Sequence, residues 1–359
     1  MAANEIADIL LNHIRKYPSM ELTDALKLIH QNVFGGGHLV TDEIYSLKTI
    51  EDETAGLPDV DANDDIFTYI GNKLYRLDLR ALRTGALSPE TLNKMFMFTS
   101  GRTGSMEDFE HKAAVLVAMC EDGRLPFPAA ETRLKITESR AAGHPAKSHS
   151  LRYKAAYAPA YRMADKMFYE YYPLFCKIDE LTRIKQTVNI AIDGNSASGK
   201  TTLAALLKRV YTCNVFTMDD FFLQQHQRTP ERLDEPGGNI DYERFADEVA
   251  APLKNGGRVA YRAYDCGTMR LSEVIKTDPA PVNIVEGVYS LHPRYARIYD
   301  IKVFISLEES EQRRRLKKRD AFLYERFLNE WIPMERKYFE HFNIAGQCGF
   351  NFPSTNSGY

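Results

Sequence analysis

The sequence of 359 residues lacks the features that mark membrane, secreted and nucleic-acid-binding proteins. No apolar run approaches the ~20 residues that a membrane-spanning helix needs. The first residues, "MAANEIADILLNHIRKYP", are amphipathic and carry acids early, unlike a secretory signal. The formal net charge of −3 gives no electrostatic reason to expect nucleic acid or a membrane surface as a partner. We therefore expect a cytoplasmic protein that binds neither.

Cysteine is scarce as well. The five cysteines are scattered, odd in number and free of CxxC spacing, which excludes a disulfide framework and a zinc ribbon. They indicate reduced thiols in a cytoplasmic protein. The chain also lacks internal repeats and long low-complexity tracts, and its composition is that of a globular protein long enough for two cores.

The first half of the chain reads mainly as helices. In "SMEDFEHKAAVLVAMCEDG", Ser105 can cap a helix whose apolar residues recur at helical spacing up to Gly123. A second helix is expected from Pro89, behind the cap Ser88. We also predict a helical stretch over residues 159–184, interrupted at Pro173.

The pattern changes near residue 184, where short β-rich runs begin to alternate with helical segments. The runs are "VNIAI", "NVFTM", "VNIVE" and "IKVFIS". Strands that alternate with helices form parallel βαβ units. The sequence thus predicts an α/β fold with a doubly wound parallel sheet in residues 184–359, preceded by a mainly α-helical domain of unknown role in residues 1–183.

The stretch "VNIAIDGNSASGKTTLA" contains the pattern of a phosphate-binding P-loop, as found in P-loop NTPases. Its glycines let successive N–H groups turn inward at a helix N-terminus, while Lys200 reaches the β- and γ-phosphates and the Thr201 hydroxyl binds Mg²⁺. The alternative, a plain Gly/Ser loop with a solvated lysine, is disfavoured because a strand precedes the motif and a helix follows it. We therefore predict ATP and Mg²⁺ as cofactors, and nucleotide contacts from Gly194, Asn195, Ser196, Ala197, Ser198, Gly199, Lys200, Thr201 and Thr202.

Three later stretches carry groups that a P-loop kinase needs. "VFTMDDFF" ends a strand with Asp219 and Asp220, and "VNIVEG" ends another with Glu286, a candidate Mg²⁺-side carboxylate. In "EESEQRRRLKKRD", Arg315 and Arg319 lie on one helical face, where arginines can neutralise a transferring phosphate. Taken singly, strand-end acids often cap helices and a charge run is usually a solvated face. The order of all three after a P-loop favours a kinase.

Residues 188–320 resemble the uridine kinase and phosphoribulokinase family of P-loop kinases. The resemblance is carried by "GNSASGKTT", "MDDFF", "NIDYERFADEVAAPLKNG", "YRAYDC", "VEGVYSL" and "RRRLKKRD". It implies Asp219 as the catalytic base, Asp241 as a contact to substrate hydroxyls and Tyr264 in the acceptor pocket. It also implies basic lid residues at Arg315 and Arg319.

The sequence departs from that family where a uridine kinase recognises its base. In "YDCGTMR", Cys266 replaces an aromatic residue and Met269 stands near the place of a histidine. Asp241, Tyr264 and Arg270 remain, a set that suits hydroxyls and an anionic group better than a flat base. We therefore predict an ATP-dependent kinase whose acceptor is a polyol, sugar or hydroxy acid. Uridine or cytidine phosphorylation and an ATP-dependent regulatory protein stay open as alternatives, as does a homo-oligomer.

One basic stretch stands out in the first half, "GHPAKSHSLRYKAAYAPAYR". A metal site at His144 and His149 is disfavoured, because no acid or cysteine is spaced to complete it. The stretch suits an acidic ligand or a contact with the kinase half, where it would help to complete or cover the acceptor pocket.

Overall fold

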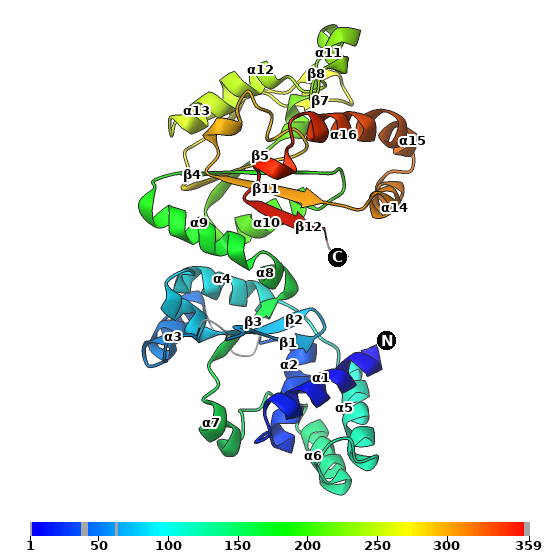
Figure 1. The fold of residues 1–359 in the computed structure, drawn as a ribbon. Helices are drawn as coiled ribbons and strands as arrows, with labels where there is room; N and C mark the ends of the chain where they lie inside the picture. The colour runs from blue at the N-terminus through cyan, green and yellow to red at the C-terminus, as the bar shows by residue number, and fades with distance from the viewer. Residues whose placement is uncertain (1, 37–41, 62–63, 355–359) are drawn as a thin grey trace. The chain divides into compact units, whose positions relative to one another are not determined.

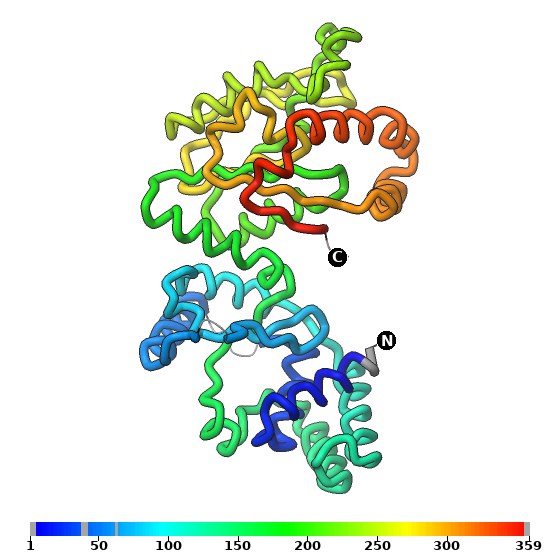
Figure 2. Tube along the Cα trace, viewed as in Figure 1, coloured from blue at the N-terminus to red at the C-terminus, as the bar shows by residue number. Residues whose placement is uncertain are grey.

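The chain folds into two units, Met1–Glu180 and Leu181–Tyr359, in a computed structural model that describes residues 2–36, 42–61 and 64–354. Figure 2 follows the chain through both units. Each unit has its own hydrophobic core of buried side chains. We refer to them as unit 1 and unit 2.

Unit 1 is a set of helices with a small antiparallel sheet (Figure 1). The sheet has the order β1-β2-β3, and α1, α2 and α6 pack against α5. The described elements are α1 (Ala2–Lys16), α2 (Leu22–Phe34), α3 (Glu43–Ala55), β1 (Phe67–Gly71), β2 (Leu74–Asp78), α4 (Pro89–Ser100), α5 (Met106–Glu121), α6 (Ala129–Ala141), α7 (Leu151–Tyr157), β3 (Tyr161–Asp165), α8 (Lys166–Glu170) and α9 (Tyr172–Ile184), which runs into unit 2.

Two of the predicted helices of unit 1 form where their caps indicate. The Ser105 hydroxyl accepts a hydrogen bond of 3.0 Å from the Asp108 N–H at the start of α5. The Ser88 hydroxyl accepts one of 3.1 Å from the Thr91 N–H at the start of α4. Each cap satisfies a backbone donor that the first turn of a helix leaves unpaired.

The prediction of one helical stretch over residues 159–184 is wrong in its first part. Tyr161–Asp165 is strand β3, which pairs antiparallel with β2, so sheet pairing overrides the local helical pattern. The interruption predicted at Pro173 lies two residues earlier, at Tyr171 between α8 and α9, and Pro173 itself is in the first turn of α9. A proline is tolerated there because the N–H that it lacks would have no partner within the helix.

Much of the basic stretch 144–162 is engaged inside unit 1. The His149 ring contacts the Asp24 carboxylate through Nδ1 (2.7 Å) and the Tyr161 hydroxyl through Nε2 (2.7 Å). His144 contacts Glu110 (2.9 Å) and Arg162 forms an ion pair with Glu53. Buried polar groups with such partners stabilise the local fold. No group of three or more His, Cys, Asp or Glu in the described ranges could hold a metal ion.

Unit 2 is built on a parallel sheet of five strands in the order β12-β11-β4-β10-β5 (Figure 1). The strands are β4 (Val188–Gly194), β5 (Cys213–Thr217), β10 (Val282–Glu286), β11 (Ile301–Ser306) and β12 (Phe350–Pro353). All four predicted β-rich runs are strands of this sheet, whereas β12 was not predicted. The three central strands are mostly buried, which suits their predominantly apolar sequences.

Helices and two short hairpins complete unit 2. They are α10 (Lys200–Val210), α11 (Pro230–Asp234), α12 (Tyr242–Phe245), α13 (Ala251–Lys254), α14 (Glu309–Arg319), α15 (Tyr324–Arg326), α16 (Ile332–His341), the pair β6 (Val259–Tyr261) and β9 (Ile275–Thr277), and the pair β7 (Tyr264–Asp265) and β8 (Arg270–Leu271). The predicted α/β fold with a parallel sheet is confirmed. No helix within the described residues is both long and apolar enough to span a bilayer.

Candidate nucleotide and phosphate-transfer site

Three chemical groups meet at one edge of the parallel sheet. Strands β4, β10 and β5 are adjacent, with Ile192 opposite Glu286 and Glu286 opposite Thr217. Because parallel strands end at the same edge, the P-loop after β4, the acids after β5 and the carboxylate at the end of β10 lie together. Ligands of open α/β sheets bind outside this edge.

The P-loop joins β4 to α10 and needs its glycines. Gly194 has φ +141°, and a Cβ there would collide with the backbone carbonyl of Ile305 on β11. Gly199 precedes α10 with φ +105°, and Ala197 is left-handed at φ +61°. Such positive φ values turn successive N–H groups toward one side, which forms a concave anion site at the helix N-terminus.

The Lys200 side chain binds the backbone of two earlier P-loop residues. Its Nζ donates to the carbonyl oxygens of Gly194 (2.9 Å) and Asn195 (2.8 Å), and the residue is buried. The Asn195 side chain accepts a hydrogen bond of 3.0 Å from the Leu307 N–H, which ties the loop to the end of β11. The ammonium group is therefore held over the loop, where it can reach a bound phosphate.

Thr201 and Glu286, the two predicted Mg²⁺ residues, are in direct contact. The Thr201 hydroxyl lies 3.2 Å from each carboxylate oxygen of Glu286. Burial raises the pKa of Glu286, and the positive charge of Lys200 opposes that rise. One hydroxyl and one carboxylate are the oxygen donors that suit Mg²⁺, which usually takes few protein ligands and completes its shell with phosphate and water. The side chains of Thr201 and Glu286 are therefore of the kind that could bind Mg²⁺.

The two adjacent acids after β5 have different surroundings. Asp219 is exposed, and its charge acts on Glu286. Asp220 is half-buried and accepts a hydrogen bond of 3.0 Å from the Tyr261 hydroxyl. Burial raises the pKa of Asp220, and that hydrogen bond opposes the rise. Asp220 is thus engaged with the protein, whereas Asp219 faces solvent near the candidate metal ligands.

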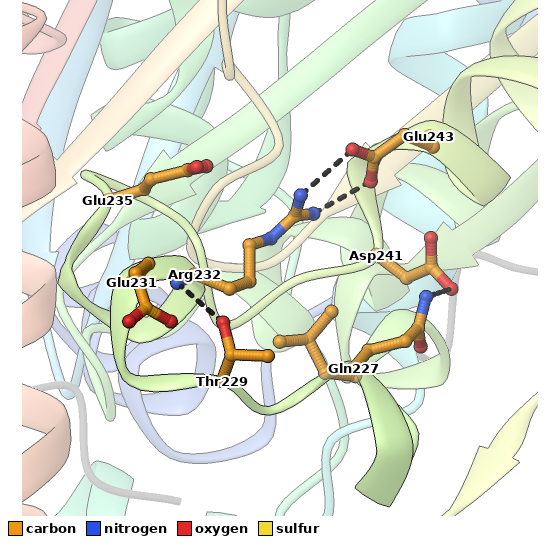
Figure 3. A pocket seen from close by; sticks show the side chains of 8 residues that line it. Gln227, Thr229, Glu231, Arg232, Glu235, Asp241 and Glu243 are labelled. Carbon is orange, nitrogen blue, oxygen red and sulfur yellow. Dashed lines mark hydrogen bonds and ion pairs between the residues drawn. The ribbon is translucent and has the colours of Figure 1, made fainter.

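A pocket of about 370 Å³ lies beside Asp241 (Figure 3). Asp241 is buried, caps α12 by accepting from the Arg244 N–H (3.1 Å), and accepts a hydrogen bond of 2.9 Å from Gln227 Nε2. The pocket is polar, and its lining includes four carboxylates and one guanidinium. The lining residues are Leu223, Gln227, Thr229, Glu231, Arg232, Glu235, Asp241 and Glu243.

The single cation of this pocket is already paired. Arg232 donates to both carboxylate oxygens of Glu243, at 2.8 and 2.7 Å, as Figure 3 shows. It also donates to the backbone carbonyls of Gly238 and Ile240. Its charge is therefore balanced within the protein.

Tyr264 and Arg270, both predicted to contact the acceptor, lie on opposite faces of the β7–β8 hairpin. Tyr264 is opposite Leu271, whereas Arg270 is opposite Asp265, and neighbouring strand residues point to opposite sides. Arg270 is exposed. The cation beside buried Tyr264 is instead Arg228, whose Nη2 lies 3.5 Å from the tyrosine hydroxyl, and this contact was not anticipated from the sequence.

The two predicted lid arginines also differ in position. Arg315 Nη1 donates to the Ala197 carbonyl of the P-loop (3.2 Å) and to the Ser354 hydroxyl (2.8 Å). Arg319 is exposed and lies over the Phe327 ring, 5.4 Å from its centroid. Arg315 thus contacts the P-loop, whereas Arg319, one turn further along α14, packs on an aromatic ring instead.

Sequence reasoning missed a buried carboxylate at the P-loop. Glu335, on α16, accepts hydrogen bonds from the N–H and the hydroxyl of Ser196. Two residues of the same helix act on the loop, because the Tyr338 hydroxyl donates to Asp193 just before Gly194 (2.9 Å). No motif marks these positions, and they lie beyond the stretch that resembles a known family.

Comparison with solved structures gives matches over about half of the chain. A possible uridine kinase from Bacillus stearothermophilus matches with TM-score 0.38 and 22% identity, covering 50% of this chain and 98% of the other. Phosphoribulokinase from Rhodobacter spheroides matches with TM-score 0.36 and 14% identity, covering 47% and 70%. D-glycerate 3-kinase from Cryptococcus neoformans matches with TM-score 0.32 and 16% identity, covering 43% and 79%.

Unit 2 has a five-stranded parallel sheet, and the loop between its strand β4 and helix α10 carries the P-loop sequence pattern. The chain is similar in structure to P-loop small-molecule kinases, and the remainder of the chain has no assigned relative. No family model matches the sequence, and no curated protein sequence matches it significantly.

Proposed function

We propose that this protein is an ATP- and Mg²⁺-dependent kinase that transfers the γ-phosphate to a hydroxyl of a small molecule. The observation that supports this most is the meeting of Lys200, the Thr201–Glu286 pair and exposed Asp219 at one sheet edge. Phosphoryl transfer needs a cation on the phosphates, oxygen ligands for Mg²⁺ and an acid for the acceptor hydroxyl. A protein that only senses ATP has no need of an acceptor-side acid, so Asp219 favours an enzyme.

Each residue has one role in this proposal. The P-loop N–H groups and Lys200 bind and orient the β- and γ-phosphates. Thr201 and Glu286 would hold Mg²⁺, which neutralises charge on the phosphates. Asp219 orients the acceptor hydroxyl and accepts its proton. Holding the two reactants in line accounts for much of the rate in such reactions.

We infer that the acceptor is an uncharged polyol or a sugar. Cys266 and Met269 are both exposed and have no aromatic ring, and Tyr264, the aromatic residue of the same stretch, is buried, so a pyrimidine finds little to stack on there. Hydroxyl groups can donate to Asp241 and accept from Gln227 in the adjacent pocket. The other carboxylates of that pocket disfavour a hydroxy acid, because its only lining cation is paired with Glu243.

The test is ADP release in the presence of ATP, Mg²⁺ and a panel of sugars, polyols, hydroxy acids, amino acids and nucleosides. We expect release that depends on a sugar or polyol. Turnover of uridine with kcat/KM of ~10⁴ M⁻¹s⁻¹ or above, in the ordinary enzymatic range, would instead support a uridine kinase. Tight ATP binding with no acceptor-dependent release would support the regulatory alternative.

A further inference from the structure

The carbonyl groups of the P-loop are held from outside by three side chains. Gln312 Nε2 donates to the Ser196 carbonyl (3.2 Å), Arg315 Nη1 to the Ala197 carbonyl (3.2 Å), and the Ser354 hydroxyl to the Ser198 carbonyl (2.6 Å). An anion site needs the loop's N–H groups to face inward, so its carbonyls must face outward and find other donors. The donors come from α14 and from the residue after β12.

A carboxylate also contacts the outer side of the loop, at Ser196. Glu335 accepts from the Ser196 N–H through Oε2 (3.1 Å) and from the Ser196 hydroxyl through Oε1. Gln312 Nε2 lies 3.4 Å from the same Oε2, so Glu335 and Gln312 together bind both the N–H and the C=O of Ser196. Only 3% of Glu335 is exposed, so its carboxyl group is held within the protein.

Glu335 lies close enough to the candidate nucleotide site to interact with its charged groups. Burial raises the pKa of its carboxyl group, and the charge of Lys200 opposes that rise. The charge of the Lys200 ammonium group, which is bonded to the loop, therefore acts on Glu335 as well. Removal of its carboxylate would take the acceptor from both the N–H and the hydroxyl of Ser196, which would loosen the hold on this part of the loop.

We propose that Glu335 is a positioning residue of the nucleotide site, which, with Gln312 and Ser354, holds the P-loop in the conformation that receives the phosphates. This inference rests on the nucleotide binding that the proposed function requires. Glu335 acts through Ser196 and touches no reacting atom. A carboxylate suits the position because it can accept from three donors at once, namely the two groups of Ser196 and the Gln312 amide.

The test is the Kd for ATP and ADP, measured by calorimetry on the full chain well below its melting temperature. We expect E335A to weaken binding about tenfold to a hundredfold, because two donors of Ser196 lose an acceptor that is charged when ionised. E335Q keeps one oxygen for the Ser196 N–H and should stay within about threefold of wild type. If E335A does not fold, S354A provides the second variant, with an expected loss of about threefold to tenfold because the Ser198 carbonyl loses its donor.

Two controls separate positioning from stability. E340A removes an exposed carboxylate from the same helix, and L253A weakens the core of unit 2 without touching the loop. Both should bind nucleotide as wild type does. Wild-type affinity in E335A and S354A, or an equal loss in L253A, would overturn the inference. If the wild-type protein binds nucleotide but transfers no phosphate, the proposed kinase activity is contradicted and the positioning role of Glu335 is not. If the wild-type protein binds no nucleotide, both are contradicted.

Discussion

The hydroxyl of Thr201 lies 3.2 Å from both oxygens of the Glu286 carboxylate. Thr201 is the last residue of the P-loop motif and Glu286 ends strand β10, so the contact links the P-loop motif to the end of the strand beside β4. A hydroxyl and a carboxylate this close can share one Mg²⁺ ion with a nucleotide.

The first prediction concerns this pair. E286Q removes the negative charge while keeping the shape of the side chain, so we expect the Mg²⁺ concentration that half-saturates turnover to rise about tenfold or more. Titration of Mg²⁺ at fixed ATP measures it. E309Q, which changes an exposed glutamate of α14, is the matched control. An unchanged Mg²⁺ requirement in E286Q would remove Glu286 from the metal site.

The second prediction separates the adjacent acids after β5. D219N should lower kcat by about two to four decades, the range expected for loss of a general base, with little change in ATP affinity. D220N should mainly lower the melting temperature, because it disturbs the hydrogen bond from Tyr261. Steady-state kinetics and thermal unfolding of both variants decide. A greater loss of kcat in D220N would show that the base is Asp220.

The third prediction concerns the acceptor pocket. Asp241 holds Gln227 and lines the pocket, so D241N should raise the KM of the best acceptor by about tenfold or more while leaving the KM for ATP within about twofold. E231Q changes an exposed acid of the same pocket and should have a smaller effect. Equal increases in both KM values for D241N would mean that Asp241 supports the fold of the whole site.

The fourth prediction is a pH dependence of stability in unit 1. Burial, together with the charge of Arg76, lowers the pKa of His13 from 6.5 to about 3, and its Nε2 has no partner among the described residues. Between these pH values the unfolded chain binds a proton there and the folded chain does not. Stability must therefore fall as the pH drops through that window, by at most ~1.4 kcal/mol per pH unit, the slope for a difference of one bound proton.

His13 can be tested by removing its titration. H13F takes away the unpaired nitrogen, so its free energy of unfolding should exceed that of wild type by an amount that grows from pH 7 to pH 4. H111F, at an exposed histidine, should follow the wild-type curve. Denaturant titrations at several pH values measure this. Parallel curves for H13F and wild type would contradict the shift at His13.

The parallel sheet could be predicted from the sequence because its signals are local. "VNIAI" and "VNIVE" are short runs of strand length that are rich in valine and isoleucine, and glycines that need positive φ mark the loop after the first of them. The closeness of Thr201 and Glu286 could likewise be expected from the sequence, since parallel strands end at one edge.

The contacts that the sequence did not reveal are long-range. Glu335 lies 139 residues after its partner Ser196, and spacing along the chain carries no information about such a pair. Tyr161–Asp165 has no strong alternation and became a strand only because β2 lies beside it. Arg270 was grouped with Tyr264 because both belong to the stretch "YDCGTMR", whereas the hairpin register puts the two on opposite faces.

The central claim is that this chain moves phosphate from ATP to a small hydroxyl compound, and one measurement addresses it most directly. The full chain is incubated with γ-labelled ATP, Mg²⁺ and a neutral metabolite extract, and the products are separated and counted. We predict a labelled small molecule with wild type and with K208A, an exposed lysine of α10, and none with K200A. Label that stays in ATP or appears only as inorganic phosphate, from a wild-type protein that binds ATP, would contradict the account.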